Sequence, residues 1–136
     1  MRMLVIDDQM TTRMLLRCML ETYGEVVEAK AGAEGVEMFG AALTAGAPFQ
    51  MVCVDLGLPD IDGNQVLEQL RAAEVQHRAS APATIVVVSG NDTDEARSDA
   101  LERSADAYLT KPVSYESMFA LLARVGAVGR AVPGRP

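Results

Sequence analysis

Five short apolar segments alternate with five helical patterns along this chain, and this alternation constrains its fold more than any other feature. The apolar segments are rich in β-forming residues and are bounded by polar or turn-forming ones. Strands are expected at residues 3–6, 26–29, 51–54, 84–88 and 107–109. Repeated strand–helix alternation predicts one α/β domain, in which helices cover both faces of a parallel sheet through right-handed crossovers.

The segments between the strands place apolar residues at helical spacing. Helices are expected at residues 11–23, 33–45, 64–74, 94–104 and 114–125. Gly24 follows the first of them, where a glycine commonly ends a helix. We therefore expect a single domain over residues 1–126, followed by a flexible tail or linker over the Gly/Pro/Arg-rich residues 127–136.

Charge and cysteine usage exclude several classes of protein. The formal net charge of −7 argues against a nonspecific nucleic-acid binder or a membrane-surface binder, since both need a basic face. No apolar stretch approaches the roughly 18–20 residues of a membrane span. Cys18 and Cys53 fall within an expected helix and strand, which is typical of unpaired thiols in a reducing compartment. These observations predict a cytoplasmic location.

Acidic, hydroxyl or basic side chains follow four of the five expected strands. They are Asp7 and Asp8 after the first strand, Asp55 after the third, Ser89 after the fourth and Lys111 after the fifth. An acid after a strand is often only a helix cap, and a lone lysine is usually solvated. Because the carboxyl ends of parallel strands open onto one edge of the sheet, we expect all five side chains to converge there.

That convergence predicts a specific chemistry. Three crowded carboxylates repel one another unless a cation neutralises them. Oxygen ligands without histidine or cysteine suit Mg²⁺ better than zinc. Lys111 and Ser89 add a positive charge and a hydroxyl, which suit a phosphoryl group. The sequence therefore predicts Mg²⁺-dependent phosphoryl transfer onto Asp55.

Four motifs occur in the order found in one known family. They are VIDDQ at positions 5–9, DLGLPDIDG at 55–63, VVVSG at 86–90 and ADAYLTKP at 105–112. With them the chain resembles the receiver domains of two-component response regulators, the CheY-like superfamily, over about residues 3–125. The resemblance implies a doubly wound, flavodoxin-like (βα)5 fold with a five-stranded parallel sheet in the order 2-1-3-4-5.

The resemblance also implies a role for each acid. Asp55 would be the phosphoacceptor. Asp8 and Asp55 would bind Mg²⁺ directly, together with the backbone carbonyl of Gly57. Asp7 would act chiefly through water bound to the metal.

By the same resemblance, residues near the ends of the fourth and fifth strands bind the phosphoryl group and change conformation when it is present. Lys111 would pair with it, and Ser89 would donate a hydrogen bond to it. Tyr108 matches the switch aromatic of the family, whose side chain turns inward as Ser89 moves toward the phosphate. The Lys111–Pro112 peptide is expected to be cis.

Other positions are expected to have structural roles. Asp62 is placed to cap the third helix, and Gly63 suits a tight turn beside it. Ser104 stands where the family usually has a glycine after the fourth helix. The only histidine, His77, lies in a loop away from the site and is expected at the surface.

The function implied is that of a signalling switch rather than an enzyme acting on an outside substrate. A histidine kinase or phosphotransfer protein would phosphorylate Asp55. The face made by the fourth helix, fifth strand and fifth helix would then bind a downstream effector protein, and the family often forms homodimers through this face.

Two alternatives are less well supported. A Mg²⁺-dependent phosphohydrolase with an aspartyl nucleophile, as in the haloacid dehalogenase-like family, places its nucleophile after the first strand, with a second acid two residues later. Here the acids after the first strand are adjacent, and Gly57 follows Asp55 by two positions. A receiver-like interaction module that never takes phosphate would not need the complete set of site residues.

Overall fold

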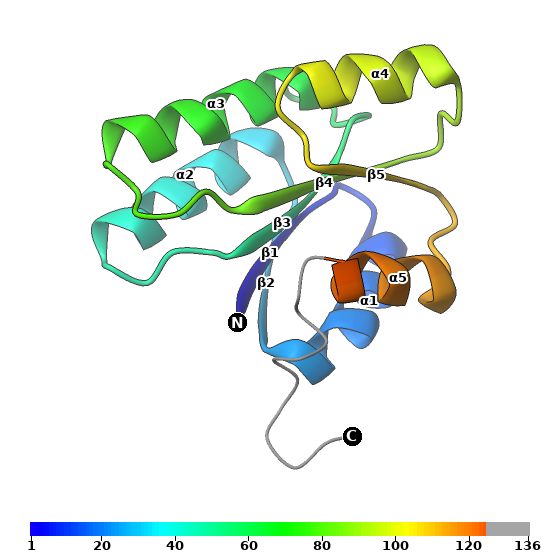
Figure 1. Cartoon of the computed structure of the whole chain (residues 1–136), viewed down its shortest axis with the longest axis horizontal. Helices are drawn as coiled ribbons and strands as arrows, with labels where there is room; N and C mark the ends of the chain where they lie inside the picture. Colours follow the sequence, from blue (N-terminus) through cyan, green and yellow to red (C-terminus); the bar gives the residue numbers. More distant parts are fainter. Residues whose placement is uncertain (125–136) are drawn as a thin grey trace.

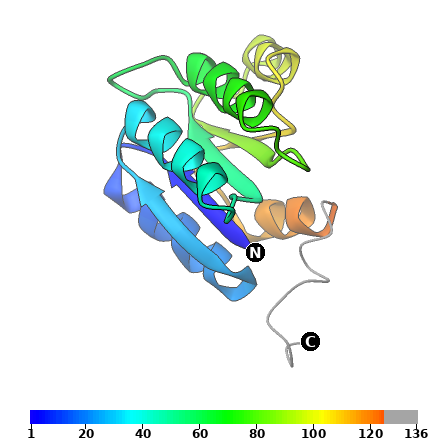
Figure 2. The same cartoon turned by 90° about the vertical axis from the view of Figure 1, so that its left-hand side faces the viewer.

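Five parallel strands form one sheet in the computed structural model, which describes residues 1–124 (Figure 1). The strands are β1 (Arg2–Ile6), β2 (Glu25–Ala29), β3 (Met51–Asp55), β4 (Thr84–Ser89) and β5 (Ala107–Thr110). Their order is β2-β1-β3-β4-β5, and every pairing is parallel. Figure 2 shows β2 at one edge of the sheet, beside β1. The predicted fold and strand order are confirmed.

Five α-helices connect the strands and cover the sheet. They are α1 (Met10–Leu20), α2 (Gly32–Thr44), α3 (Gly63–Gln76), α4 (Asp94–Glu102) and α5 (Tyr115–Arg124), with a 3-10 turn η1 (Glu21–Tyr23) after α1. In the described part of the chain, none of the helices combines the length and apolar character that crossing a bilayer requires. The predicted domain boundary at residue 126 and the tail over 127–136 lie outside the described residues.

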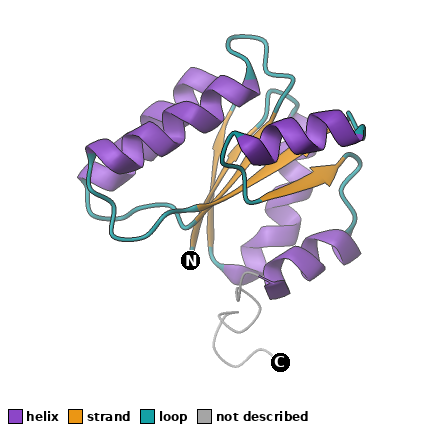
Figure 3. Cartoon of the chain, turned by 45° about the horizontal axis from the view of Figure 1, so that its top comes forward, coloured by secondary structure: helices purple, strands orange, loops and turns teal. Residues whose placement is uncertain are grey.

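Helices cover both faces of the sheet (Figures 1 and 3), and an apolar layer of the core lies on each face. Leu4 and Ile6 of β1 point toward α2 and α3, whereas Met3 and Val5 point toward α1 and α5. This split follows from the alternation of side chains along a strand. Because β1, β3 and β4 are covered on both faces, they are apolar at consecutive positions, as the sequence indicated.

Helix α4 ends two residues earlier than predicted, and Ser104 explains why. Ser104 has a φ of 79°, in the left-handed region that favours glycine. The N–H of Ala105 donates to the Ala100 carbonyl, and the N–H of Ser104 donates to the Leu101 carbonyl, a Schellman cap. The structure thus forms a cap of the type usual for glycine and places a serine in it.

The turn after β3 is shaped by a helix cap and a close backbone approach. Asp62 caps α3 as predicted, since its carboxylate accepts from the Asn64 N–H at 2.9 Å. A Cβ on Gly63 would lie 2.5 Å from Leu56 Cα and 2.7 Å from the Asp55 carbonyl oxygen. Gly63 is therefore needed for contact with the backbone at Asp55, rather than for a turn that only glycine can adopt.

Candidate functional site

Three acids from two neighbouring strands meet at the carboxyl edge of the sheet. Asp7 and Asp8 follow β1, and Asp55 ends β3, which pairs with β1. One carboxylate oxygen from each residue lies within 4.8 Å of the others. Asp7 is 1% exposed and Asp55 6%, whereas Asp8 is open to solvent. The structure brings together the three acids that the sequence placed at strand ends.

Lys111 reaches this cluster from the loop after β5. Its Nζ lies 3.0 Å from Asp7 Oδ2 and 3.5 Å from Asp55 Oδ1. The same amine lies 3.4 Å from Gln9 Oε1. Its backbone N–H donates to the carbonyl of Ser89 at 2.7 Å, and the following peptide to Pro112 is cis, as predicted.

Ser89 and Tyr108 lie beside the cluster and are linked through one loop. Ser89 is buried at the end of β4, and its Oγ accepts from the Asn91 N–H at 3.1 Å. The Tyr108 hydroxyl donates to the Asn91 carbonyl at 2.5 Å. The Arg97 guanidinium lies over the Tyr108 ring, 4.9 Å from its centre. Tyr108 is only 6% exposed, so its side chain already points inward in this structure.

The donor set fits a hard divalent cation. Asp7 Oδ2 is buried, and its charge faces the Lys111 amine 3.0 Å away. A buried carboxylate with two more carboxylates beside it is the kind of group that Mg²⁺ binds. The Gly57 N–H donates to Asp55 Oδ1 at 3.1 Å, which keeps Gly57 next to the cluster.

The electrostatics of the cluster act on Asp55. The pKa of Asp55 lies above its ordinary value of 3.8, and burial is the largest cause. The negative charge of Asp7 also raises this pKa, whereas the hydrogen bond from the Gly57 N–H and the positive charge of Lys111 lower it. Because the pKa is higher in the folded than in the unfolded protein, ionising Asp55 costs stability. This cost is absent below the unfolded pKa and complete once the pH exceeds the folded pKa.

We therefore expect Asp55→Asn to raise the midpoint of thermal unfolding at pH 7 in the presence of a chelator. The gain should shrink as the pH falls through the raised pKa of Asp55, because the carboxyl group then becomes neutral in the folded wild type as well. Calorimetry across this pH range measures both effects. The burial argument would be contradicted if Asp55→Asn had a lower unfolding midpoint than the wild type at pH 7 and this difference became smaller at lower pH.

Two buried or bridging groups near the site were missed by the sequence reasoning. Arg13 is 6% exposed, and its guanidinium donates to the Asp7 carbonyl. Arg13 lies three residues before Leu16 and seven before Leu20, so helical spacing places it on the buried face of α1. This spacing is the sequence signal that predicts its burial. The Asp60 carboxylate accepts from the N–H groups of Gly32 and Ala33 and so caps α2. No local pattern links Asp60 to that helix.

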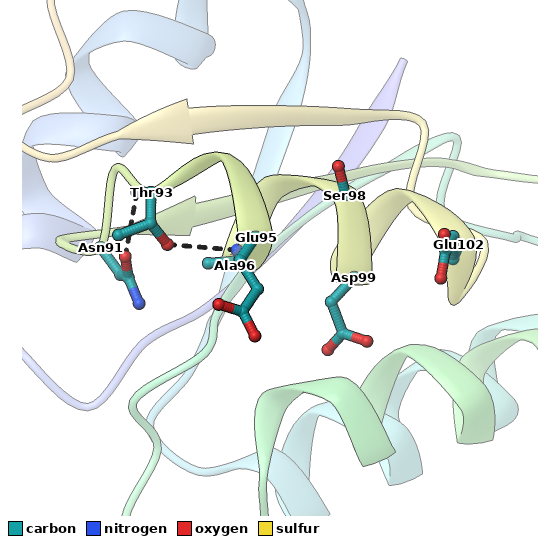
Figure 4. Close-up of a pocket in the computed structure, with 7 residues that line it drawn as sticks. All are labelled: Asn91, Thr93, Glu95, Ala96, Ser98, Asp99 and Glu102. Carbon is teal, nitrogen blue, oxygen red and sulfur yellow. Dashed lines mark hydrogen bonds between the residues drawn. The ribbon is translucent and has the colours of Figure 1, made fainter.

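A polar pocket of about 590 Å³ lies along α4, apart from the acid cluster (Figure 4). Thr93 caps the helix by accepting from the Ala96 N–H, and Asp99 faces α3. Asn64 at the start of α3 donates to Asp99 at 3.3 Å. The lining residues of the pocket all come from α4 and the loop before it, and none of them belongs to the acid cluster.

Comparison with known proteins points to one family. Residues 3–123 match the profile described as "Response regulator receiver domain". The cell cycle transcriptional regulator CtrA of Caulobacter vibrioides is 31% identical over 135 residues, covering 98% of this chain and 52% of that protein. The sensory/regulatory protein RpfC of Xanthomonas campestris pv. campestris is 37% identical over 113 residues, covering 83% of this chain and 15% of that protein. The chain thus spans about half of one relative and a small part of the other.

One similar solved structure is that of a response regulator protein from Burkholderia pseudomallei with a phosphorylated aspartic acid, a calcium ion and citrate. It superposes with a TM-score of 0.73 at 28% identity, over 94% of this chain and 72% of that one. The described chain and this protein share one fold over nearly the whole of the present sequence.

Proposed function

The chain belongs to the response regulator receiver domain family, and from this we propose that it is a phosphorylation-controlled switch whose phosphoacceptor is Asp55. The donor is a histidine kinase or a phosphotransfer protein. The observation that carries the proposal is the meeting of Asp7, Asp8 and Asp55 with the amine of Lys111 at one edge of the sheet. The Burkholderia protein, which holds a phosphorylated aspartate and a calcium ion, supports the same chemistry here.

The proposed transfer is a single displacement at phosphorus. A carboxylate oxygen of Asp55 forms the new P–O bond while the bond from phosphorus to the donor's leaving atom breaks, which leaves an acyl phosphate on the protein. Lys111, 3.5 Å from Asp55 Oδ1, is placed to bind one phosphoryl oxygen. Ser89 can donate its hydroxyl proton to another, because its Oγ is already an acceptor for the Asn91 N–H.

The acids would hold the cation that this reaction needs. We assign Asp8, Asp55 and the Gly57 carbonyl as direct Mg²⁺ ligands, with Asp7 acting through water. Bound Mg²⁺ would offset the negative charge of the phosphoryl group and the three acids. The close spacing of the three carboxylates supports this assignment.

The signal would leave the site through the loop after β4. A phosphoryl group adds a charge of about −1.5 to −2 at pH 7 and would draw Ser89 and Lys111 toward Asp55. Asn91 accepts from Tyr108, and Arg97 of α4 stacks on that ring, so a shift of the loop would act on both β5 and α4. We propose that the α4-β5-α5 face binds the effector protein, and that homodimers form there.

Two further features complete the proposal. Cys18 and Cys53 are free thiols, which agrees with a reducing, cytoplasmic location. The chemistry of the domain would be limited to gaining and losing its own phosphoryl group.

Intact-mass measurement tests the proposal directly. Incubated with Mg²⁺ and a small acyl phosphate, the protein should gain the mass of one phosphoryl group, and a chelator should prevent the gain. No gain under any of these conditions would overturn the assignment. Steady release of phosphate from assorted phosphate monoesters would instead favour a hydrolase.

A further inference from the structure

Arg13 of α1 is buried although it carries a full positive charge. It is 6% exposed, and no other lysine or arginine within residues 1–124 is buried to that degree. Arginine is rarely buried unless its charge is paired and its N–H groups are bonded. A buried guanidinium beside the acid cluster therefore requires a specific explanation.

The contacts of Arg13 join two strands at the edge of the site. Its Nη1 donates to the backbone carbonyl of Asp7 at 2.8 Å, in a buried hydrogen bond. Its Nε donates to Glu28 Oε1 of β2 at 3.0 Å. The other carboxylate oxygen of Glu28, Oε2, accepts from Arg17 Nε at 2.6 Å in a partly exposed pair. Glu28 thus holds the guanidinium in the orientation that reaches Asp7.

The carbonyl that Arg13 binds belongs to the peptide between Asp7 and Asp8. On the other side of Asp7, its N–H donates to the Ala29 carbonyl at 3.1 Å, and its Oδ1 accepts from the Gln9 N–H at 2.8 Å. Displacement of the backbone at this peptide would move both carboxylates relative to Asp55. Arg13 is the side chain that opposes this displacement from the α1 side.

We propose that Arg13 is a positioning residue for the metal site, acting through the Asp7 carbonyl and held in place by Glu28. The inference rests on the proposed function, because it assumes that Asp7 and Asp8 serve a cation. Groups behind the ligands of a metal commonly set its affinity by orienting those ligands. Lysine could not replace Arg13 fully, because a single ammonium lacks the planar fork that reaches both partners.

Positioning and simple electrostatics predict opposite results when Arg13 is removed. If Arg13 contributed only its positive charge, its loss would strengthen the binding of a cation to the nearby acids. If it positions the acids, its loss should weaken that binding even though the local charge becomes more negative. The direction of the change in Mg²⁺ affinity therefore distinguishes the two roles.

Titration calorimetry of the full chain with Mg²⁺ gives this direction. We expect Arg13→Met to raise the dissociation constant by about 10-fold to 100-fold. Arg17→Met is the matched control, since it also removes a partner of Glu28 but touches no residue of the cluster. It should change the dissociation constant by no more than about 2-fold, as is usual for a partly exposed pair. The dissociation constant of Arg13→Lys should lie nearer to that of Arg13→Met than to that of the wild type. If Arg13→Met does not fold, the Mg²⁺ affinity of Arg13→Lys tests the inference instead.

A second readout needs no metal. Hydrogen exchange at the Gln9 amide, which bonds to Asp7 Oδ1, should be faster in Arg13→Met than in Arg17→Met. Unchanged or tighter Mg²⁺ binding in both Arg13 variants would overturn the inference, as would unchanged exchange at Gln9. A wild-type protein that neither binds Mg²⁺ nor takes a phosphoryl group would instead overturn the proposed function.

Discussion

Asp55→Asn protein should gain no phosphoryl group from an acyl phosphate and Mg²⁺, under conditions in which the wild type gains one. The carboxylate oxygen is the proposed nucleophile, and a neutral amide cannot form a stable acyl phosphate in its place. The substitution keeps the shape of the side chain and removes its charge, and with it the ion pair with Lys111. Intact mass, followed over time for both proteins, measures the effect as complete loss.

Asp92→Asn is the matched control for that experiment. Asp92 is an exposed acid in the loop after β4, and its substitution removes the same charge. This variant should take phosphate at the rate of the wild type. If Asp55→Asn still gained the mass of a phosphoryl group, the phosphoacceptor would be a residue other than Asp55.

Lys111→Met should slow phosphorylation by about 10²-fold at saturating Mg²⁺, the usual cost of removing one charged or hydrogen-bonding group from a transition state. Lys111 Nζ contacts both Asp7 and Asp55, so its loss removes the protein cation nearest to the transferring group. Mg²⁺ affinity should not fall, because a competing positive charge has been removed from the acids. A time course of intact mass, together with Mg²⁺ calorimetry, separates the two effects.

The only other lysine in the chain provides the control. Lys30 follows β2 at an exposed position, and Lys30→Met changes the net charge by the same amount. Its phosphorylation rate should match the wild type. Equal rates for Lys111→Met and the wild type would exclude Lys111 from the reaction.

Much of this fold was predictable because the signals that specify it are local. Strands such as 84–88 are apolar at consecutive positions, which is characteristic of central strands in a parallel sheet. Polar residues directly after the strands must share one edge of the sheet. The meeting of the three acids with Lys111 could therefore be expected from the sequence. The order of the strands came from the resemblance, since alternation alone does not specify it.

Predictions that depended on the ends of elements were less accurate. The first helix was expected to continue to residue 23, but its last three residues form a 3-10 turn. The third helix runs two residues past its predicted end, and the fourth stops at Glu102. Helix ends are set by competing hydrogen bonds that differ little in energy, so a periodic pattern locates them poorly.

The roles of Gly63 and Asp60 depend on tertiary contacts. The sequence suggested a tight turn at Gly63, whereas the structure shows the backbone at Leu56 and Asp55 too close for any Cβ. Asp60 caps a helix that begins 28 residues earlier in the chain. Both roles depend on which segments pack together, and no spacing within a short window contains that information.

The amino-acid sequence was enough to predict the class of fold and the edge of the sheet at which the three acids and the lysine meet. It was enough because strand and helix periodicity are local properties, and because parallel strands all point their carboxyl ends the same way. Only the tertiary structure showed that Arg13 is bound to Asp7 and Glu28, and that Tyr108 already lies inward under Arg97. These contacts join residues from different elements, so they exist only once the helices have packed on the sheet.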